Sequence, residues 1–199
     1  MATGAGPIAA FEAVVLAAGA GVRFGGGKLL APWRGGLLIE AALATAFTAP
    51  VRGVTVVTGA DAEALAAAAR AFDPRVRIVH AASHAEGMGA SLRCAIASLP
   101  EDAQAVFVFL GDMPRVPIAV LEPLAQAVRA GAPAAAPLFA GRRGNPVVLA
   151  RDLFPDLLAL TGDAGARGVL QSLGPALALV EAPDDGVLFD VDQRRDLAG

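Results

Sequence analysis

The chain has 199 residues, of which 55% are hydrophobic, and its net charge at pH 7 is −3. This length and apolar content predict one folded domain with a sizeable core and exclude a disordered chain. The small negative charge argues against nucleic-acid binding through a basic surface. Cys94 is the one cysteine, so an internal disulfide is excluded and a reducing compartment is favoured.

The first ten residues carry no basic residue and no long hydrophobic run. They therefore lack the pattern of a secretory signal, and we expect residues 1–10 to form a disordered tail. No stretch of the sequence is apolar for the length that a bilayer requires. These features predict a cytoplasmic protein with no membrane partner, folded as a single domain over residues 1–199.

Short apolar runs alternate with segments rich in alanine and leucine. The runs predict strands at Ala13–Leu16, Val54–Thr58, Val76–His80, Ala105–Leu110 and Ala134–Leu138. The segments between them predict helices near Leu37–Thr48, Asp61–Ala71, Gly89–Leu99 and Pro117–Ala130. This alternation is typical of an α/β fold with a mainly parallel sheet, and strands that are apolar throughout indicate a sheet covered on both faces.

The pattern changes after Leu138. The segment Gly141–Pro146 separates two apolar runs and predicts a small β-hairpin insertion. Two further helices, near Arg151–Leu160 and Ala164–Leu173, are expected before a last strand and a polar tail. No internal repeat or linker divides the chain, which supports the prediction of one domain.

A glycine-rich segment directly follows the first predicted strand. Leu16–Lys28 contains five glycines together with Arg23 and Lys28. Glycines let a backbone turn tightly and expose its N–H groups, and such concave arrays of amides suit phosphate oxygens. The two cationic side chains suit the same ligand. The segment therefore predicts a nucleotide-phosphate loop, with a flexible turn between a strand and a helix as the alternative.

The loop matches neither of the two best-known phosphate fingerprints. The Walker pattern requires glycine where Val22 stands and serine or threonine where Leu29 stands. The dinucleotide fingerprint that would start at Gly19 requires glycine in place of Phe24. Kinase-like and dehydrogenase-like sites of these standard classes are therefore disfavoured.

Acidic residues follow two of the apolar runs. Asp112 lies just beyond the strand that ends at Leu110, and Asp190 and Asp192 follow the run Val187–Phe189. Ligands of parallel sheets bind at the carboxyl ends of the strands, and Mg²⁺ prefers oxygen ligands. These carboxylates therefore predict a magnesium site. The alternatives are a turn aspartate at Asp112 and a solvated tail around the acidic pair.

Weaker signals surround these residues. Gly87–Leu92 opens a predicted helix, where Ser91 either caps the N-terminus, lines a ligand site or takes part in ordinary helix initiation. Asp163 has the pattern of a helix N-cap, and Arg167 is a candidate phosphate or substrate contact. His80 and His84 have no metal-ligand spacing to a cysteine cluster, and we interpret them as structural or incidental.

The ordered set of these segments resembles the MobA-like nucleotidyltransferases, and within them the molybdenum cofactor cytidylyltransferases. The resemblance runs from about Ala13 to Leu197. Its carriers are Leu16–Lys28 with the following Leu29–Pro32, then Gly87–Leu92, Leu110–Pro114, Arg143–Leu149, Gly162–Arg167 and Asp190–Asp192. The guanylyltransferase branch typically has glycine where this chain has Ala18, and Gly-Pro-Leu-Ala-Gly where it has Gly87–Ser91. Both differences favour CTP over GTP.

The resemblance implies a three-layer, Rossmann-like nucleotidyltransferase fold and an enzyme that transfers CMP from CTP to the terminal phosphate of molybdenum-bound molybdopterin, releasing pyrophosphate. It assigns catalytic roles to Arg23, Lys28 and Asp112. It assigns nucleotide binding to Leu16, Ala17, Ala18, Gly19, Gly21, Arg23, Lys28, Gly87 and Ser91. Asn145 and Arg167 become candidates for the acceptor side, and Asp112, Asp192 and Asp190 for Mg²⁺.

Some residues depart from the family pattern. Met113 stands where the cytidylyltransferases often have glutamine, Asn145 where they often have histidine, and Gln193-Arg194 where Thr-Pro is usual. The alternatives are therefore a related transferase that uses GTP or another phosphate or alcohol acceptor, and a non-catalytic nucleotide- or cofactor-binding chaperone. The resemblance also implies transient contact with a molybdenum hydroxylase or its chaperone.

Overall fold

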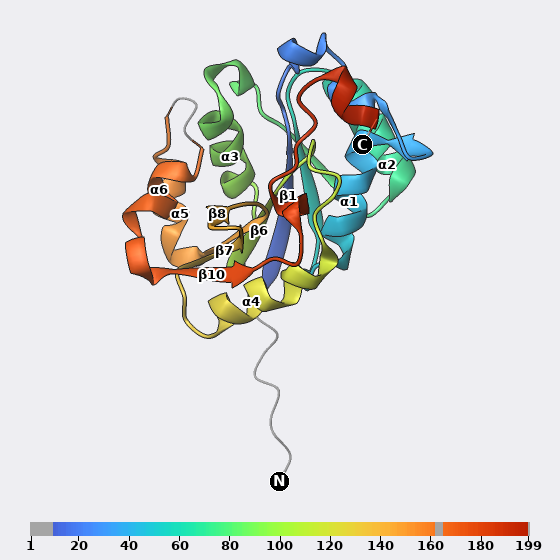
Figure 1. Ribbon diagram of the computed structural model, residues 1–199. Coiled ribbons are helices and arrows are strands. Elements are labelled where there is room, and N and C mark those ends of the chain that lie inside the picture. The colour runs from blue at the N-terminus through green and yellow to red at the C-terminus, as the bar shows by residue number, and fades with distance from the viewer. Residues whose placement is uncertain (1–9, 162–164, 199) are drawn as a thin grey trace.

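A mostly parallel sheet forms the centre of the protein in the computed structural model, which describes residues 10–161 and 165–198 (Figure 1). Its order is β10-β7-β9-β6-β1-β4-β5, and β8 pairs with β7. The strands are β1 (Phe11–Ala17), β4 (Val54–Thr58), β5 (Arg77–His80), β6 (Ala105–Leu110), β7 (Ala134–Phe139), β8 (Arg142–Arg143), β9 (Val147–Ala150) and β10 (Leu177–Glu181). A separate antiparallel pair is formed by β2 (Pro32–Trp33) and β3 (Gly36–Leu37).

Helices cover both faces of the sheet (Figure 1). They are α1 (Leu38–Thr48), α2 (Ala62–Phe72), α3 (Met88–Ala97), α4 (Leu121–Arg129), α5 (Phe154–Leu158) and α6 (Arg167–Ser172). Residues of α1, α2 and α4 share one buried cluster with Val15 of β1, whereas residues of α3, α5 and α6 share the other with Val14. Successive strand residues thus face opposite helical layers, and the predicted three-layer α/β fold is confirmed.

The hairpin expected around Gly141–Pro146 is present, because β7 and β8 pair in antiparallel fashion. The apolar run that follows it goes further than the sequence predicted. As β9, it enters the central sheet between β6 and β7 and is antiparallel to both. Periodicity predicts a strand here but not its neighbours, since pairing is decided by contacts distant in the sequence.

Three predicted helices are shorter in the structure. The region Pro117–Ala130 begins with a 3₁₀ turn at Ile118–Val120 before α4, and Arg151–Leu160 begins with a 3₁₀ turn at Arg151–Leu153 before α5. The last helix, α6, starts at Arg167. The predicted helix cap at Asp163 lies outside the described residues. The predicted N-terminal tail, residues 1–10, also lies outside them, apart from Ala10.

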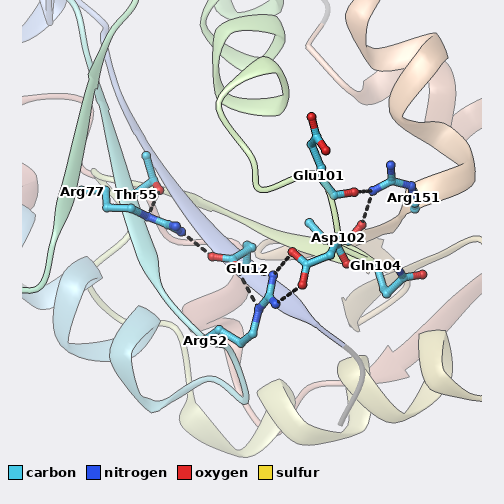
Figure 2. Close-up of polar contacts among 9 residues, drawn as sticks. Glu12, Arg52, Thr55, Arg77, Glu101, Asp102, Gln104 and Arg151 are labelled. Carbon is cyan, nitrogen blue, oxygen red and sulfur yellow. Dashed lines mark hydrogen bonds and ion pairs between the residues drawn. The ribbon is translucent and has the colours of Figure 1, made fainter. Parts of the chain in front are cut away.

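Glu12 lies in β1, one residue before the predicted strand Ala13–Leu16, and its carboxylate is buried with only 1% of the residue exposed. Arg52 and Arg77 both pair with it from outside the strand (Figure 2). Arg52 also donates two hydrogen bonds to Asp102, of 2.6 and 2.9 Å. This interaction is the largest cause of the raised pKa of Arg52. The network ties β1 to its neighbours at the amino ends of the parallel strands, opposite the candidate site.

Among the described residues, none of the helices has the length and apolar character needed to cross a membrane.

Candidate functional site

A pocket of about 310 Å³ lies at the carboxyl ends of β1 and β6. Its wall contains six of the residues singled out from the sequence: Leu16, Ala18, Gly19, Gly87, Ser91 and Asp112. His84, Met88 and Leu110 complete it. Ala17 is buried in the core beside it and is not part of the wall. The pocket thus lies at the carboxyl ends of the strands, where ligands of parallel sheets bind. The residues that form it are up to 96 positions apart in the sequence, from Leu16 to Asp112.

The glycine-rich loop reaches its shape through backbone angles that side chains rarely adopt. Gly21, Gly25, Gly26 and Gly27 all have positive φ, from 59° to 94°. The carbonyl of Gly21 accepts hydrogen bonds from the N–H groups of residues 24, 25 and 26, at 2.9 to 3.2 Å. Those three amides stabilise the loop itself and are not free to bind a phosphate.

Lys28 and Asp112 meet at the base of this loop. The Lys28 Nζ lies 2.6 Å from the Asp112 Oδ2, and the two side chains are only 15% and 24% exposed. Lys28 opens a short 3₁₀ turn that follows Gly27, while Asp112 follows β6. A cation and a carboxylate from segments 84 residues apart are thus held together beside the pocket.

The C-terminal segment crosses the same strand end. The N–H of Val191 donates to the main-chain carbonyl of Asp112 over 2.9 Å, and Val187 and Val191 are fully buried. These two valines anchor the segment at the strand end, although Asp190 and the residues 193–195 are exposed. Because Asp190 and Asp192 flank Val191, they are carried to the end of β6 near Asp112.

The C-terminal segment also contacts the glycine-rich loop through side chains. Arg23 Nη1 lies 2.5 Å from Asp192 Oδ2, and the guanidinium of Arg194 lies 4.9 Å from the ring centre of Phe24. Asp196 accepts hydrogen bonds from the N–H groups of Asp192 and Gln193, at 2.9 and 2.7 Å, and these bonds lower its pKa. Sequence reasoning gave Arg194 and Asp196 no such part, since Arg194 was noted only as a departure from the family pattern and Asp196 lies in no motif.

The carboxylates around Asp190 are the candidate ligands of a metal ion. The pKa of Asp190 is raised, first by partial burial and then by the negative charges of Asp112 and Asp192, with Lys28 acting in the opposite direction. No group of three or more acidic, histidine or cysteine side chains among residues 10–161 and 165–198 forms a metal-binding cluster by itself. The donors present are oxygen atoms, which fit Mg²⁺ or Mn²⁺ when substrate phosphates and waters supply the remaining ligands.

Helix α3 supplies the opposite wall of the pocket. It begins at Met88 after Gly87, and Ser91 lies within its first turns, where the residue is 5% exposed. No side chain caps this helix, so the interpretation of Ser91 as a cap is wrong, and Ser91 lies instead in the wall of the pocket. His84, which the sequence left without a role, lies in the same wall.

The two acceptor candidates are placed differently. The N–H of Asn145 donates to the carbonyl of Val187 over 2.9 Å, so the β8–β9 loop is held against the segment that leads to Asp190. Arg167 begins α6 and is exposed, and it belongs neither to the pocket wall nor to an ion pair described for residues 10–161 and 165–198.

A larger cavity of about 700 Å³ lies at the amino ends of the strands, near Gln104, Arg129 and Arg151. Its cations already have partners: Arg129 pairs with Glu122, and Arg151 donates to main-chain carbonyls. Because ligands of parallel sheets bind at the carboxyl ends of the strands, the smaller pocket, which lies there beside the glycine-rich loop, is the better candidate for phosphate chemistry.

Two known proteins are similar to this chain over most of its length. The chain is 33% identical over 192 residues to nicotine blue oxidoreductase of Paenarthrobacter nicotinovorans, and 32% identical over 188 residues to the purine catabolism protein PucB of Bacillus subtilis (strain 168). Each match covers 90% of this chain and 90% of the relative.

Solved structures with the same fold include Rv0371c from Mycobacterium tuberculosis H37Rv, at 29% identity and a TM-score of 0.84, covering 96% of this chain and 97% of that one. A Rv0371C complex with manganese aligns with a TM-score of 0.72 at 28% identity, covering 87% and 88%. A nucleotidyl transferase from Methanothermobacter thermautotroptrophicus aligns with a TM-score of 0.80 at 27% identity, covering 95% and 94%.

Residues 13–177 match the MobA-like NTP transferase domain, which is most of the chain. The chain therefore belongs to the MobA-like NTP transferase family and is a nucleotidyltransferase.

Proposed function

We propose that this nucleotidyltransferase moves CMP from CTP to the terminal phosphate of molybdenum-bound molybdopterin and releases pyrophosphate. The observation that carries the proposal is the meeting of Lys28 and Asp112 beside a pocket walled by Ala18 and Ser91. The loop residue Ala18 favours CTP by its resemblance to the cytidylyltransferases, in which alanine replaces the glycine of the guanylyltransferases.

The reaction is an in-line displacement at the α-phosphorus of CTP. A bond forms between an acceptor phosphate oxygen and this phosphorus, while the bond from the phosphorus to the oxygen bridging to the β-phosphate breaks. The acceptor oxygen is already ionised at neutral pH, so no general base is required. The protein's contribution is to position the two substrates and to stabilise charge.

We assign the nucleotide to the pocket, with its base against Ala18, Gly87 and Ser91, and its phosphates toward Gly21 and Lys28. The amides of Gly19 and Gly21 take no part in the three bonds to the Gly21 carbonyl, so they are available to phosphate oxygens. Arg23 and Lys28 stabilise the charge that develops on the departing pyrophosphate.

The carboxylates of Asp112 and Asp192 are the proposed ligands of Mg²⁺, with Asp190 beside them. A bound Mg²⁺ would neutralise phosphate charge and hold the triphosphate in a reactive geometry. The pKa of Asp190 is raised first by desolvation and then by the negative charges of Asp112 and Asp192, and this second contribution supports the assignment because it requires the three carboxylates to be close together. Asn145 and Arg167 are assigned to the acceptor side.

Pyrophosphate release tests the proposal. Purified protein is incubated with Mg²⁺, molybdenum-bound molybdopterin and each nucleoside triphosphate in turn. We expect release with CTP that depends on the acceptor. Release with GTP alone would overturn the donor, and release from CTP with a sugar or alcohol but not with the pterin would overturn the acceptor.

One relative has the name of an oxidoreductase, so the same preparation is also assayed with nicotine blue and NADH or NADPH. We expect no consumption of the nicotinamide cofactor. Turnover in this assay, without pyrophosphate release in the first, would replace the proposed transfer with a redox function.

A transient complex with a molybdenum hydroxylase or its chaperone is expected as the route by which the product leaves.

A further inference from the structure

We propose that His84 reads the base of the bound nucleotide and selects cytosine against uracil by accepting a hydrogen bond at Nε2. This inference rests on the proposed function, since it requires a pyrimidine nucleotide in the pocket. It begins from the position of His84 in the pocket wall, together with Ala18, Gly87 and Ser91. The residue is half-buried and belongs to the wall of the pocket.

One ring nitrogen already has a partner. The Nδ1 of His84 lies 3.0 Å from the carbonyl oxygen of Ala81, and a carbonyl oxygen only accepts. Nδ1 therefore carries the hydrogen. In the neutral ring this fixes the tautomer and leaves Nε2 as an acceptor with no hydrogen.

The other end of the side chain is pinned by Gly59, which follows β4. A Cβ at Gly59 would lie 2.6 Å from the His84 Cγ and 2.6 Å from the carbonyl oxygen of Ala18. Glycine here lets the imidazole pack directly on the backbone beside Ala18. With Cβ and Cγ against Gly59 and Nδ1 on Ala81, the edge that remains for the pocket carries Nε2.

An acceptor in this place distinguishes the two pyrimidines. Cytosine presents an exocyclic amino group at C4, which donates a hydrogen bond, whereas uracil presents an oxygen there, which only accepts. Opposite the Nε2 lone pair, cytosine forms a hydrogen bond and uracil brings two acceptors together. Because an unsatisfied polar group in a buried site is unfavourable, we expect CTP to bind about tenfold more tightly than UTP.

The test is titration calorimetry with CTP and with UTP, in the presence of Mg²⁺, on the full chain and on two variants. In His84→Asn the side-chain amide keeps a donor near the Nδ1 position but has no atom at the Nε2 position. We expect it to lose about tenfold in CTP affinity, with UTP little changed. In His84→Gln the side-chain oxygen extends toward the Nε2 position, and part of the preference for CTP should return.

His80 provides the matched control, because its ring packs against that of His84, with 6.2 Å between the ring centres, but is not in the pocket wall. His80→Phe, which keeps this ring contact, should leave the ratio of the two affinities unchanged, and thermal melting of each variant reports folding. An unaltered ratio in a folded His84→Asn overturns the role of His84 while leaving the proposed function intact. Failure of the unmodified protein to bind any nucleoside triphosphate overturns the proposed function instead.

Discussion

Lys28 and Asp112 form a part-buried ion pair, with the ammonium nitrogen 2.6 Å from a carboxylate oxygen. The lysine thus neutralises the carboxylate to which we assign Mg²⁺. Arg23 does the same for Asp192, at 2.5 Å. Binding of a metal–nucleotide complex would exchange both pairs, because the carboxylates would turn to the cation and the basic side chains to the phosphates.

Lys28→Met is therefore expected to change metal binding and catalysis in opposite directions. Without the ammonium group, the negative charge of Asp112 is no longer neutralised by an ion pair, so Mn²⁺ should bind more tightly in the absence of nucleotide. Turnover should fall about 10²- to 10³-fold, because a charge-stabilising contact to the leaving group is lost. Metal titration followed by electron paramagnetic resonance measures the first effect, and pyrophosphate release the second.

The exposed Arg70 of α2 supplies the control for Lys28→Met. Arg70→Met removes one positive charge far from the site and should alter neither quantity. Weaker Mn²⁺ binding in Lys28→Met would show that the ion pair does not compete with metal.

Asp112→Asn is expected to lower turnover by about 10²- to 10³-fold with little effect on folding. The amide keeps the shape of the side chain, and Asp112 lies at a strand end with its carboxylate 24% exposed, outside the core. Asp156→Asn on α5, an exposed carboxylate away from the pocket, is the matched control. If both variants transfer nucleotide at the same rate, Asp112 is not a metal ligand in the reaction.

Much of the site follows from local sequence. The alternation of apolar runs predicts the strands, and the rule that ligands bind at strand ends then selects the glycine-rich loop and Asp112. Neither step needs the three-dimensional fold. Ala18, Gly19 and Gly87 lie in the pocket wall for the same reason, since each belongs to a segment that directly follows a strand or opens a helix.

The rest depends on contacts that local patterns do not contain. Arg23 and Asp192 are 169 residues apart in the chain, and the polar residues after Phe189 resemble a solvated tail. Only the burial of Val187 and Val191 turns this segment toward Asp112. His84 was missed because its place depends on Gly59, which belongs to another strand's loop, and no motif spacing links the two.

Asp196 is expected to support catalysis through Asp192. Its carboxylate accepts from the N–H groups of Asp192 and Gln193, and thereby fixes the turn that presents the acidic pair. Both bonds end on Asp196 Oδ2, and in Asp196→Asn a neutral amide oxygen, which is a weaker acceptor than a carboxylate, takes its place, so kcat/KM for the nucleotide should fall by about tenfold. Higher Mg²⁺ concentrations should recover part of this loss if the effect acts through metal binding. Recovery at no concentration would point to a different role.

Substitution of Glu12 is expected to change the stability of the fold but not the candidate site. Glu12→Gln removes a buried negative charge between Arg52 and Arg77, whose side chains are 39% and 45% exposed and can still be hydrated (Figure 2). We expect a loss of about 1–3 kcal/mol in the free energy of unfolding, measured by urea denaturation. Replacing both arginines with glutamine should destabilise the fold more, because the buried carboxylate then has no cation. The opposite order would show that the arginines do not stabilise Glu12.

Ala18→Gly tests the choice of donor. The Ala18 side chain is 4% exposed and lines the pocket, and the related guanylyltransferases carry glycine at this place. Removing the methyl group enlarges the base end of the pocket, so the ratio of kcat/KM for CTP to that for GTP should fall by about tenfold. Ala20→Gly, two residues further along the same loop and outside the pocket wall, adds the same backbone freedom and should leave the ratio unchanged. If the ratio is equal in Ala18→Gly and the unmodified protein, the methyl group does not select the base, and selection must come from the α3 side of the pocket.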